Sequence, residues 1–143
     1  MDRIKIGDIE LIAVTDGAAP PVSPSWPFPE VPDNDWNSHR YALDPDGLHT
    51  SNFGCFVIRD KEATILVDTG MGSHPPERFG QPPGLLPGSL LAAGVKPTDV
   101  TKVVFTHLHF DHVGWAFSKD RVYPFFPNAR YVCLLYTSPS PRD

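Results

Sequence analysis

The sequence THLHFDH, at residues 106–112, places three histidines and one aspartate within six consecutive positions. At the His and Asp frequencies of this chain, the pattern His-x-His-x-Asp-His arises by chance in roughly one such chain in a thousand, so the spacing carries information. Imidazole nitrogens and carboxylate oxygens are ligands that zinc-like ions prefer. The cluster therefore predicts a metal site formed by His107, His109, Asp111 and His112.

The residues before the cluster predict how it is held. The apolar run VVF in TKVVFTHLH is typical of a buried strand, so we expect the histidines where that strand ends. Residues two apart in an extended chain project to the same side, so His107 and His109 can bind one ion. A turn after Phe110 would bring Asp111 and His112 beside it, where they suit a second ion. The other three histidines, His39, His49 and His74, lack close partners, and we expect no metal role for them.

Composition restricts the fold and the partners. The chain has 143 residues, 41% of them hydrophobic, which is enough for one domain with a core and not for two. The net charge of −5 without a basic run disfavours a nucleic-acid partner. The start, MDRIKIGDIEL, lacks the apolar core of a signal peptide, and no later run approaches a membrane span. We therefore expect a soluble cytoplasmic protein without a membrane partner, in which Cys55 and Cys133 are reduced thiols.

The first half of the chain is predicted to be rich in β-strands. IKIGDIELIAVTDG indicates a hairpin with Gly7 and Asp8 at its turn. SNFGCFVIRD and ATILVDTG indicate a second hairpin, joined by a charged turn at residues 60–62. Their nearly unbroken apolar runs are typical of strands covered on both faces. We therefore expect packing partners on each side of this sheet.

GSLLAAGVKP predicts a short helix. Ser89 is the expected N-cap, Leu90 and Leu91 are expected to face the core, and Gly94 is expected to end the helix in a left-handed conformation.

A proline-rich segment lies between the two hairpins. Residues 18–36 contain six prolines and the aromatic side chains Trp26, Phe28 and Trp36, a content incompatible with a helix or a central strand. Two interpretations remain open: a long irregular loop packed on the surface, or a lid whose aromatic residues contact substrate or the second subunit of a homodimer.

The motif THLHFDHVGW, preceded by TILVDTG and DVTKVVF, resembles the metallo-β-lactamase superfamily of metallohydrolases over about residues 4–132. The resemblance implies an α+β fold, the αββα sandwich, of which residues 1–132 would form the amino-terminal half. Residues 133–143 resemble translated sequencing adapter, so we expect a non-native or disordered tail there, with a native linker as the alternative.

The resemblance also assigns roles within the site. It implies that His107 and His109 bind the first of two zinc ions and that Asp111 and His112 bind the second, with iron or manganese as other suitable metals. It places Asp68 beside the ligands, where its carboxylate would orient one of them; a turn carboxylate is the alternative. Asp111 and Asp68 are thus the candidate catalytic residues.

The resemblance further implies that the remaining ligands come from a second half. No histidine follows His112, and Asp120 follows it too closely for us to expect a bridge between two ions. The chain as given supplies two ligands per metal, so we expect weak zinc binding and no efficient hydrolysis by this chain alone.

The function implied is hydrolysis by a metal-bound hydroxide, with a small-molecule ester, lactone or phosphotriester as substrate. Trp115 and Phe110 would either line an apolar pocket or pack in the core. An iron-dependent oxidoreductase of the same superfamily is one alternative function, and a fragment without catalytic activity is the other.

Overall fold

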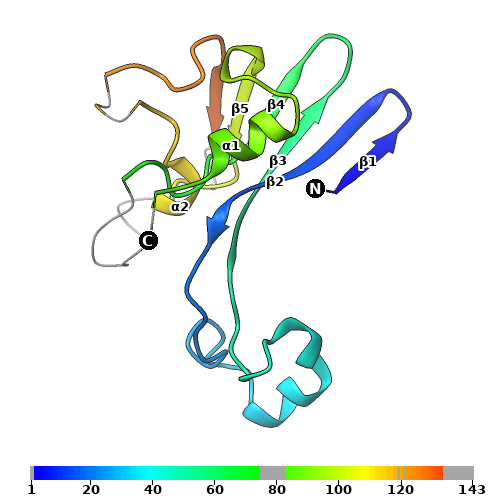
Figure 1. Cartoon of the computed structure of the whole chain (residues 1–143), viewed down its shortest axis with the longest axis vertical. Coiled ribbons are helices and arrows are strands. Elements are labelled where there is room, and N and C mark those ends of the chain that lie inside the picture. Colours follow the sequence, from blue (N-terminus) through cyan, green and yellow to red (C-terminus); the bar gives the residue numbers. More distant parts are fainter. Residues whose placement is uncertain (1, 75–82, 119, 121, 134–143) are drawn as a thin grey trace. The chain divides into compact units, whose positions relative to one another are not determined.

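The computed structural model describes residues 2–74, 83–118, 120 and 122–133. They form an α+β fold around a six-stranded sheet in the order β1-β2-β3-β4-β5-β6 (Figure 1). The strands are β1 (Arg3–Ile6), β2 (Ile9–Ala18), β3 (Asn52–Arg59), β4 (Thr64–Val67), β5 (Lys102–Phe105) and β6 (Arg130–Cys133). The helices are the 3-10 helices η1 (Asp33–Ala42) and η3 (Pro97–Asp99) and the α-helices α1 (Leu86–Ala92) and α2 (Phe110–Val113).

The chain divides into two compact units. We call Met1–Gly17 with Phe53–Asp143 the sheet unit, and Ala18–Asn52 the insert. Both predicted hairpins are confirmed in the strand pairing, since β1 pairs antiparallel with β2, and β3 with β4. The strand β5 pairs parallel with β4 on one side and with β6 on the other. Parallel pairs need a long connection, and α1 lies in the connection between β4 and β5. Among the described residues no helix is long and apolar enough to cross a membrane.

The helix α1 differs from its prediction in two details. It begins at Leu86, so Ser89 lies inside the helix instead of capping it, and the Ser89 hydroxyl accepts a hydrogen bond from the backbone N–H of Thr15 (3.1 Å). Leu90 is fully buried, whereas Leu91 is 70% exposed. The expectation that both leucines face the core is wrong because successive helical residues lie about 100° apart around the axis.

The end of α1 allows a paired test of backbone conformation. Gly94 follows the helix with φ 76°, as predicted, and a methyl group added there would meet no atom. Gly94→Ala should therefore lower the free energy of unfolding by about 1 kcal/mol through left-handed strain alone. Gly88→Ala, inside the same helix and equally unobstructed, should raise it by roughly 0.5–1 kcal/mol because alanine loses less conformational entropy. Urea unfolding of both variants measures these changes, and equal effects of the two substitutions would contradict the left-handed helix end.

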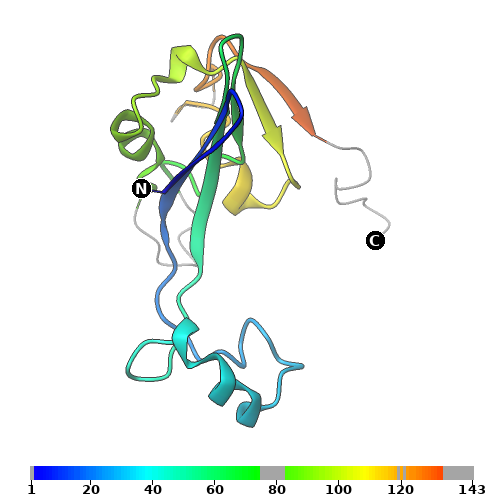
Figure 2. The same ribbon diagram turned by 90° about the vertical axis from the view of Figure 1, so that its right-hand side faces the viewer.

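The hydrophobic core lies on one face of the sheet, where α1 packs (Figure 2). Side chains of neighbouring strands at paired positions, Val57, Leu66 and Val103, are fully buried and join the cluster that contains Leu90. Phe56, which points to the opposite face, is 45% exposed. Among the described residues the sheet is thus covered on one face, whereas cover on both faces is what the apolar runs predict for a complete sandwich. An apolar run indicates that a strand can be covered on both faces, but the described part of the chain provides packing partners for one face only.

Cys55 belongs to this core, and burial raises the pKa of its thiol to about 12. No disulfide joins Cys55 to Cys133. The predicted tail overlaps β6 at Cys133, and its other residues, 134–143, lie outside the described residues.

The insert is more ordered than predicted. Residues 20–32 lack regular structure, but η1 begins directly after Pro32, the last proline of the segment, and its ten residues contain no proline. Within the insert Phe28 packs against Trp36 (ring centroids 5.6 Å apart) and His49 (5.5 Å). The third aromatic residue of the segment, Trp26, is 76% exposed.

Candidate metal centre

The structure places the cluster where the sequence predicts it, at the end of β5. The strand ends at Phe105, residues up to His109 stay outside regular structure, and the single helical turn of α2 begins at Phe110. The predicted turn is thus this helical turn, which carries Asp111 and His112. A strand end followed by one helical turn presents four side chains from six consecutive residues on the same part of the surface.

All four predicted ligands lie together. The imidazole ring of His107 is 4.5 Å from that of His109 and 4.0 Å from that of His112, measured between ring centroids. Nε2 of His107 and Nδ1 of His109 are 3.1 Å apart. Nε2 of His112 and Oδ2 of Asp111 are 3.6 Å apart. The donor atoms therefore approach one another as two pairs.

Asp68 lies directly beneath the cluster, one residue beyond the end of β4. Its Oδ1 accepts a hydrogen bond from the backbone N–H of Thr106 (2.9 Å), and its Oδ2 accepts one from the Thr106 hydroxyl (2.8 Å). Oδ2 also lies 2.9 Å from Nδ1 of His112. Because a carboxylate can only accept, Nδ1 of His112 is the donor in this contact, and the other ring nitrogen, Nε2, is the one that faces Asp111.

The backbone of Asp68 has φ 60°, a left-handed conformation that is uncommon outside glycine and that aspartate tolerates better than most residues. Its carboxylate is nearly fully buried, while the side chains it holds are accessible. Such a conformation persists where the surroundings determine it, and here the two bonds from Thr106 do so.

The surroundings of His107 favour its neutral imidazole. Burial lowers the pKa of His107, and the neighbouring His112 and His109 lower it further because a second positive charge beside them would be repelled. Metal ligation requires a neutral ring with a free lone pair, so this shift keeps His107 in the state that a ligand needs.

The pairs are suited to zinc by donor type and spacing. Two nitrogens of one tetrahedral zinc ion lie about 3.3 Å apart, given Zn–N bonds of about 2.0–2.1 Å, and the 3.1 Å between His107 and His109 is close to this value. Among the described residues no three His, Cys, Asp or Glu side chains are grouped as a metal site. His107 with His109 and Asp111 with His112 would each supply two of the ligands of an ion, with Asp68 behind them.

The remaining predicted residues lie elsewhere or have other partners. His39 packs against Trp36 and Tyr41 in the insert, and His74 lies 2.9 Å from the Ser73 hydroxyl. Nδ1 of His49 is buried in the insert without a hydrogen-bond partner among the described residues. Asp120 accepts bonds from the Ser118 hydroxyl and the Val122 amide, as a turn carboxylate does.

Of the two aromatic residues predicted to line a pocket or pack in the core, Trp115 packs against Phe125 (ring centroids 4.8 Å apart) at the edge of the core. Phe110 is 39% exposed beside the histidines, and the neighbouring Leu108 is 41% exposed. Phe110 is therefore the more accessible of the two side chains.

Three polar residues near the cluster were not predicted: Thr69, Thr106 and Asp16. Thr69 is fully buried, and both its N–H (2.7 Å) and its hydroxyl (3.0 Å) donate to the carbonyl of His112. Asp16 is 2% exposed and accepts bonds from three segments distant in sequence. The sequence signal for Asp16 was an Asp-Gly pair at the end of a strand with alternating apolar residues. A turn explains such a pair equally well.

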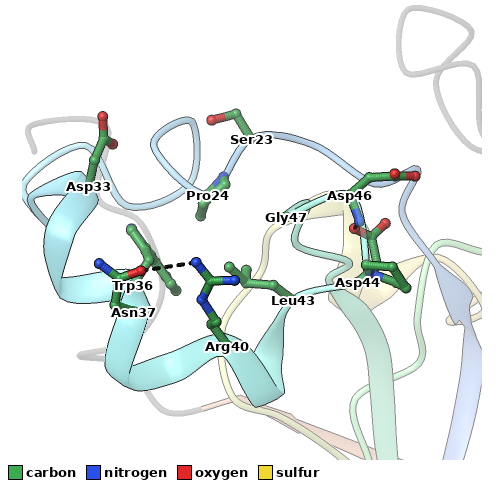
Figure 3. A pocket seen from close by; sticks show the side chains of 11 residues that line it. Ser23, Pro24, Asp33, Trp36, Asn37, Arg40, Leu43, Asp44, Asp46 and Gly47 are labelled. Atoms are coloured by element: carbon green, nitrogen blue, oxygen red, sulfur yellow. Dashed lines mark hydrogen bonds between the residues drawn. The ribbon is translucent and has the colours of Figure 1, made fainter.

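The insert contains a separate cavity of about 820 Å³ (Figure 3). Trp36, Arg40 and Asp44 are among its lining residues, and Nη2 of Arg40 donates to Oδ1 of Asn37 (3.2 Å). Nε1 of Trp36 is buried without a hydrogen-bond partner among the described residues. The cavity is lined by side chains of both charge signs, and no three possible metal ligands are grouped there among the described residues.

The fold and the site thus define a candidate metal-binding protein, in which a His-x-His-x-Asp-His cluster lies at a strand end with a buried aspartate beside it. Comparison with known proteins agrees, because residues 55–123 match the family described as the metallo-beta-lactamase superfamily. Over these residues, slightly less than half of the chain, the sequence is similar to that superfamily. The six-stranded sheet agrees with part of the αββα sandwich expected from the sequence.

Curated relatives and solved structures narrow the comparison. An N-acyl homoserine lactonase of Bacillus thuringiensis is 31% identical over 99 residues, which cover 56% of this chain and 38% of the relative. The crystal structure of AbOPH, a hydrolase in the β-lactamase superfamily, is 31% identical with a TM-score of 0.72 and is matched over 90% of this chain and 42% of its own. AidC, a dizinc quorum-quenching lactonase solved with its product, is 29% identical with a TM-score of 0.73, over 91% of this chain and 43% of its own. The chain thus spans about two fifths of the length of the proteins it matches.

Proposed function

We propose that this chain forms the metal-binding part of a zinc-dependent hydrolase that opens lactones. The observation that carries the proposal is the convergence of four donor side chains at the end of β5, beside a buried aspartate whose carboxylate contacts Nδ1 of His112. The similarity to N-acyl homoserine lactonases and to a dizinc lactonase supports a lactone as the substrate class. Aryl esters and phosphotriesters remain substrates to be compared with it.

The residues would divide the work as follows. His107 and His109 would hold one zinc ion, and Asp111 and His112 the other. When bound, the ions supply Lewis-acid activation of water and of the scissile carbonyl. Asp68 would keep His112 in the tautomer whose Nε2 can act as a ligand, and Thr106 would keep Asp68 in place through two hydrogen bonds.

The exposed apolar side chains beside the cluster would contact the substrate. Leu108 and Phe110 are both accessible and lie between the ligands in sequence, so an apolar acyl group bound over the metals would meet them. The contribution of Phe110 would be to binding, because its ring has no group that can transfer a proton.

Zinc titration of the chain tests the proposal first. With two protein ligands per ion, water would fill the other coordination positions. We therefore expect zinc binding that is weak and that is lost in His109→Ala. Competition against a chromophoric chelator measures the affinity, and His39→Ala is the matched control because this histidine lies in the insert. Equal zinc affinity of the parent and His109→Ala would contradict the site.

Hydrolysis is the second test. A protein in which this chain continues into a second half with further ligands should hydrolyse an N-acyl homoserine lactone faster than an aryl ester or a phosphotriester, and a chelator should abolish the activity. Activity on the lactone that survives complete removal of the metal would refute the proposed function.

A further inference from the structure

The carboxylate of Asp16 lies at the meeting point of four chain segments. Its Oδ1 accepts hydrogen bonds from the backbone N–H of Leu86 (2.6 Å) and from Nε1 of Trp115 (2.8 Å). Its Oδ2 accepts bonds from the backbone N–H groups of Met71 (2.7 Å) and Gly72 (3.0 Å). These partners belong to the start of α1, to the segment after α2 and to the loop after β4, while Asp16 itself lies near the end of β2.

This buried group has no capacity left for a ligand. Burial raises the pKa of the Asp16 carboxyl, and the four hydrogen bonds oppose that rise. The two oxygens offer about four lone-pair positions, and all of them are used. A side chain at Gly70 or at Gly84 would overlap atoms of the carboxylate, so the chain closes around it. Asp16 therefore organises structure and contacts no substrate.

Two of the four segments also bind each other, next to the metal ligands. The carbonyl of His112 accepts from the N–H of Thr69 (2.7 Å), and the N–H of Trp115 donates to the carbonyl of Thr69 (3.1 Å). The N–H of Gly114 donates to the carbonyl of Gly70 (2.7 Å). Residues 69–72 and 112–115 thus form one hydrogen-bonded unit, which we call the 69/112 ladder, and Asp16 binds both of its segments.

We propose that Asp16 is a positioning residue for the metal centre: through Trp115 and the amides of Met71 and Gly72, its carboxylate fixes the 69/112 ladder and thereby the place of His112. The expected effect of Asp16 on zinc affinity rests on the proposed function, whereas the hydrogen bonds that Asp16 accepts are present without metal. Contacts behind a ligand typically change metal affinity by about 10–100-fold when they are removed. The carboxylate acts through the ladder and touches none of the ligands.

Trp115→Phe tests the proposal with little change in packing, since it removes the indole N–H that Asp16 binds and keeps an aromatic ring against Phe125. Asp16→Asn is the second variant, in which the amide NH₂ faces two N–H donors. The control is Val100→Ala. Val100 is fully buried and precedes β5, whereas the histidines follow the other end of that strand. The substitution lowers stability without touching the ladder, so that stability loss alone can be recognised.

Two measurements are made on the full chain. The first is amide hydrogen exchange without metal. It is expressed as the ratio of the exchange rates at residues 114 and 115 to those at Val103 and Val104 in β5. In Trp115→Phe the amide of the substituted residue 115 is the one measured. Trp115→Phe should raise this ratio about tenfold, whereas Val100→Ala should leave it unchanged. The second is the zinc dissociation constant, which should rise about tenfold in Trp115→Phe and stay at the parent value in Val100→Ala.

The outcomes separate the two proposals. An unchanged exchange ratio in Trp115→Phe overturns the positioning role, even if Asp16→Asn fails to fold. A raised ratio together with an unchanged zinc affinity also overturns it, because the ladder would then not control the ligands. If the parent takes up no zinc, the proposed function falls, and the exchange ratio alone decides whether Asp16 holds the ladder.

Discussion

His109→Ala and Asp111→Ala are expected to abolish hydrolysis and to remove zinc from a protein that continues this chain into a second half with further ligands. Each substitution deletes a donor atom, and water in its place cannot reproduce the geometry that an incompletely filled zinc shell needs. The loss should exceed the roughly 10–100-fold that removal of a contact behind a ligand costs. Turnover on a lactone and zinc content per protein chain are the two measurements.

Asp68→Asn provides the internal comparison. The amide oxygen can still accept from the N–H of Thr106, but the NH₂ group would face Nδ1 of His112 and favour the wrong tautomer. Its effect should therefore lie within about 10–100-fold, milder than that of a lost ligand. His39→Ala, in the insert, should match the parent. If Asp111→Ala kept zinc and parental turnover on every substrate that the parent hydrolyses, the assignment of the second pair would be wrong.

The local pattern of the sequence was sufficient to predict the two hairpins, the strand β5 and the position of the cluster at its end. Alternating or continuous apolar residues bounded by Gly-Asp or charged turns identify both hairpins, and the apolar run before His107 identifies β5. The histidine spacing places donors on one side of the chain without reference to anything distant. These features depend on neighbours within a few residues, which a sequence displays directly.

The features that were missed depend on contacts between segments distant in sequence. Asp16 contacts Trp115, 99 positions later, and nothing local distinguishes it from the turn aspartate that an Asp-Gly pair usually indicates. The exposure of Phe56 depends on which packing partners are present, and the apolar run that contains it cannot show that. Leu90 faces the core and Leu91 faces solvent because of how α1 is rotated about its axis. The helix begins at Leu86, earlier than its sequence signals indicate.

Gly114→Ala is expected to destabilise the chain more than Gly94→Ala does, and it tests the 69/112 ladder by sterics instead of hydrogen bonding. Gly114 has ordinary right-handed helical angles (φ −60°, ψ −38°), so alanine would suffer no conformational strain. A methyl group there would overlap the backbone of Met71 and Gly72, which cannot move aside as the end of a flexible side chain can. Overpacking of this kind costs about 3 kcal/mol, or roughly 10 °C in melting temperature for a chain of this size.

The comparison with Gly94→Ala separates the two causes by which a glycine becomes irreplaceable. Gly94 is strained and unobstructed, whereas Gly114 is unstrained and obstructed. Because the obstruction lies in the ladder that carries His112, Gly114→Ala should lose zinc affinity as well as stability, and Gly94→Ala should lose stability alone. Differential scanning calorimetry and zinc titration of both variants measure this. A Gly114→Ala protein that melts with the parent would show that residues 70–72 and 114 do not approach each other as closely as the structure places them.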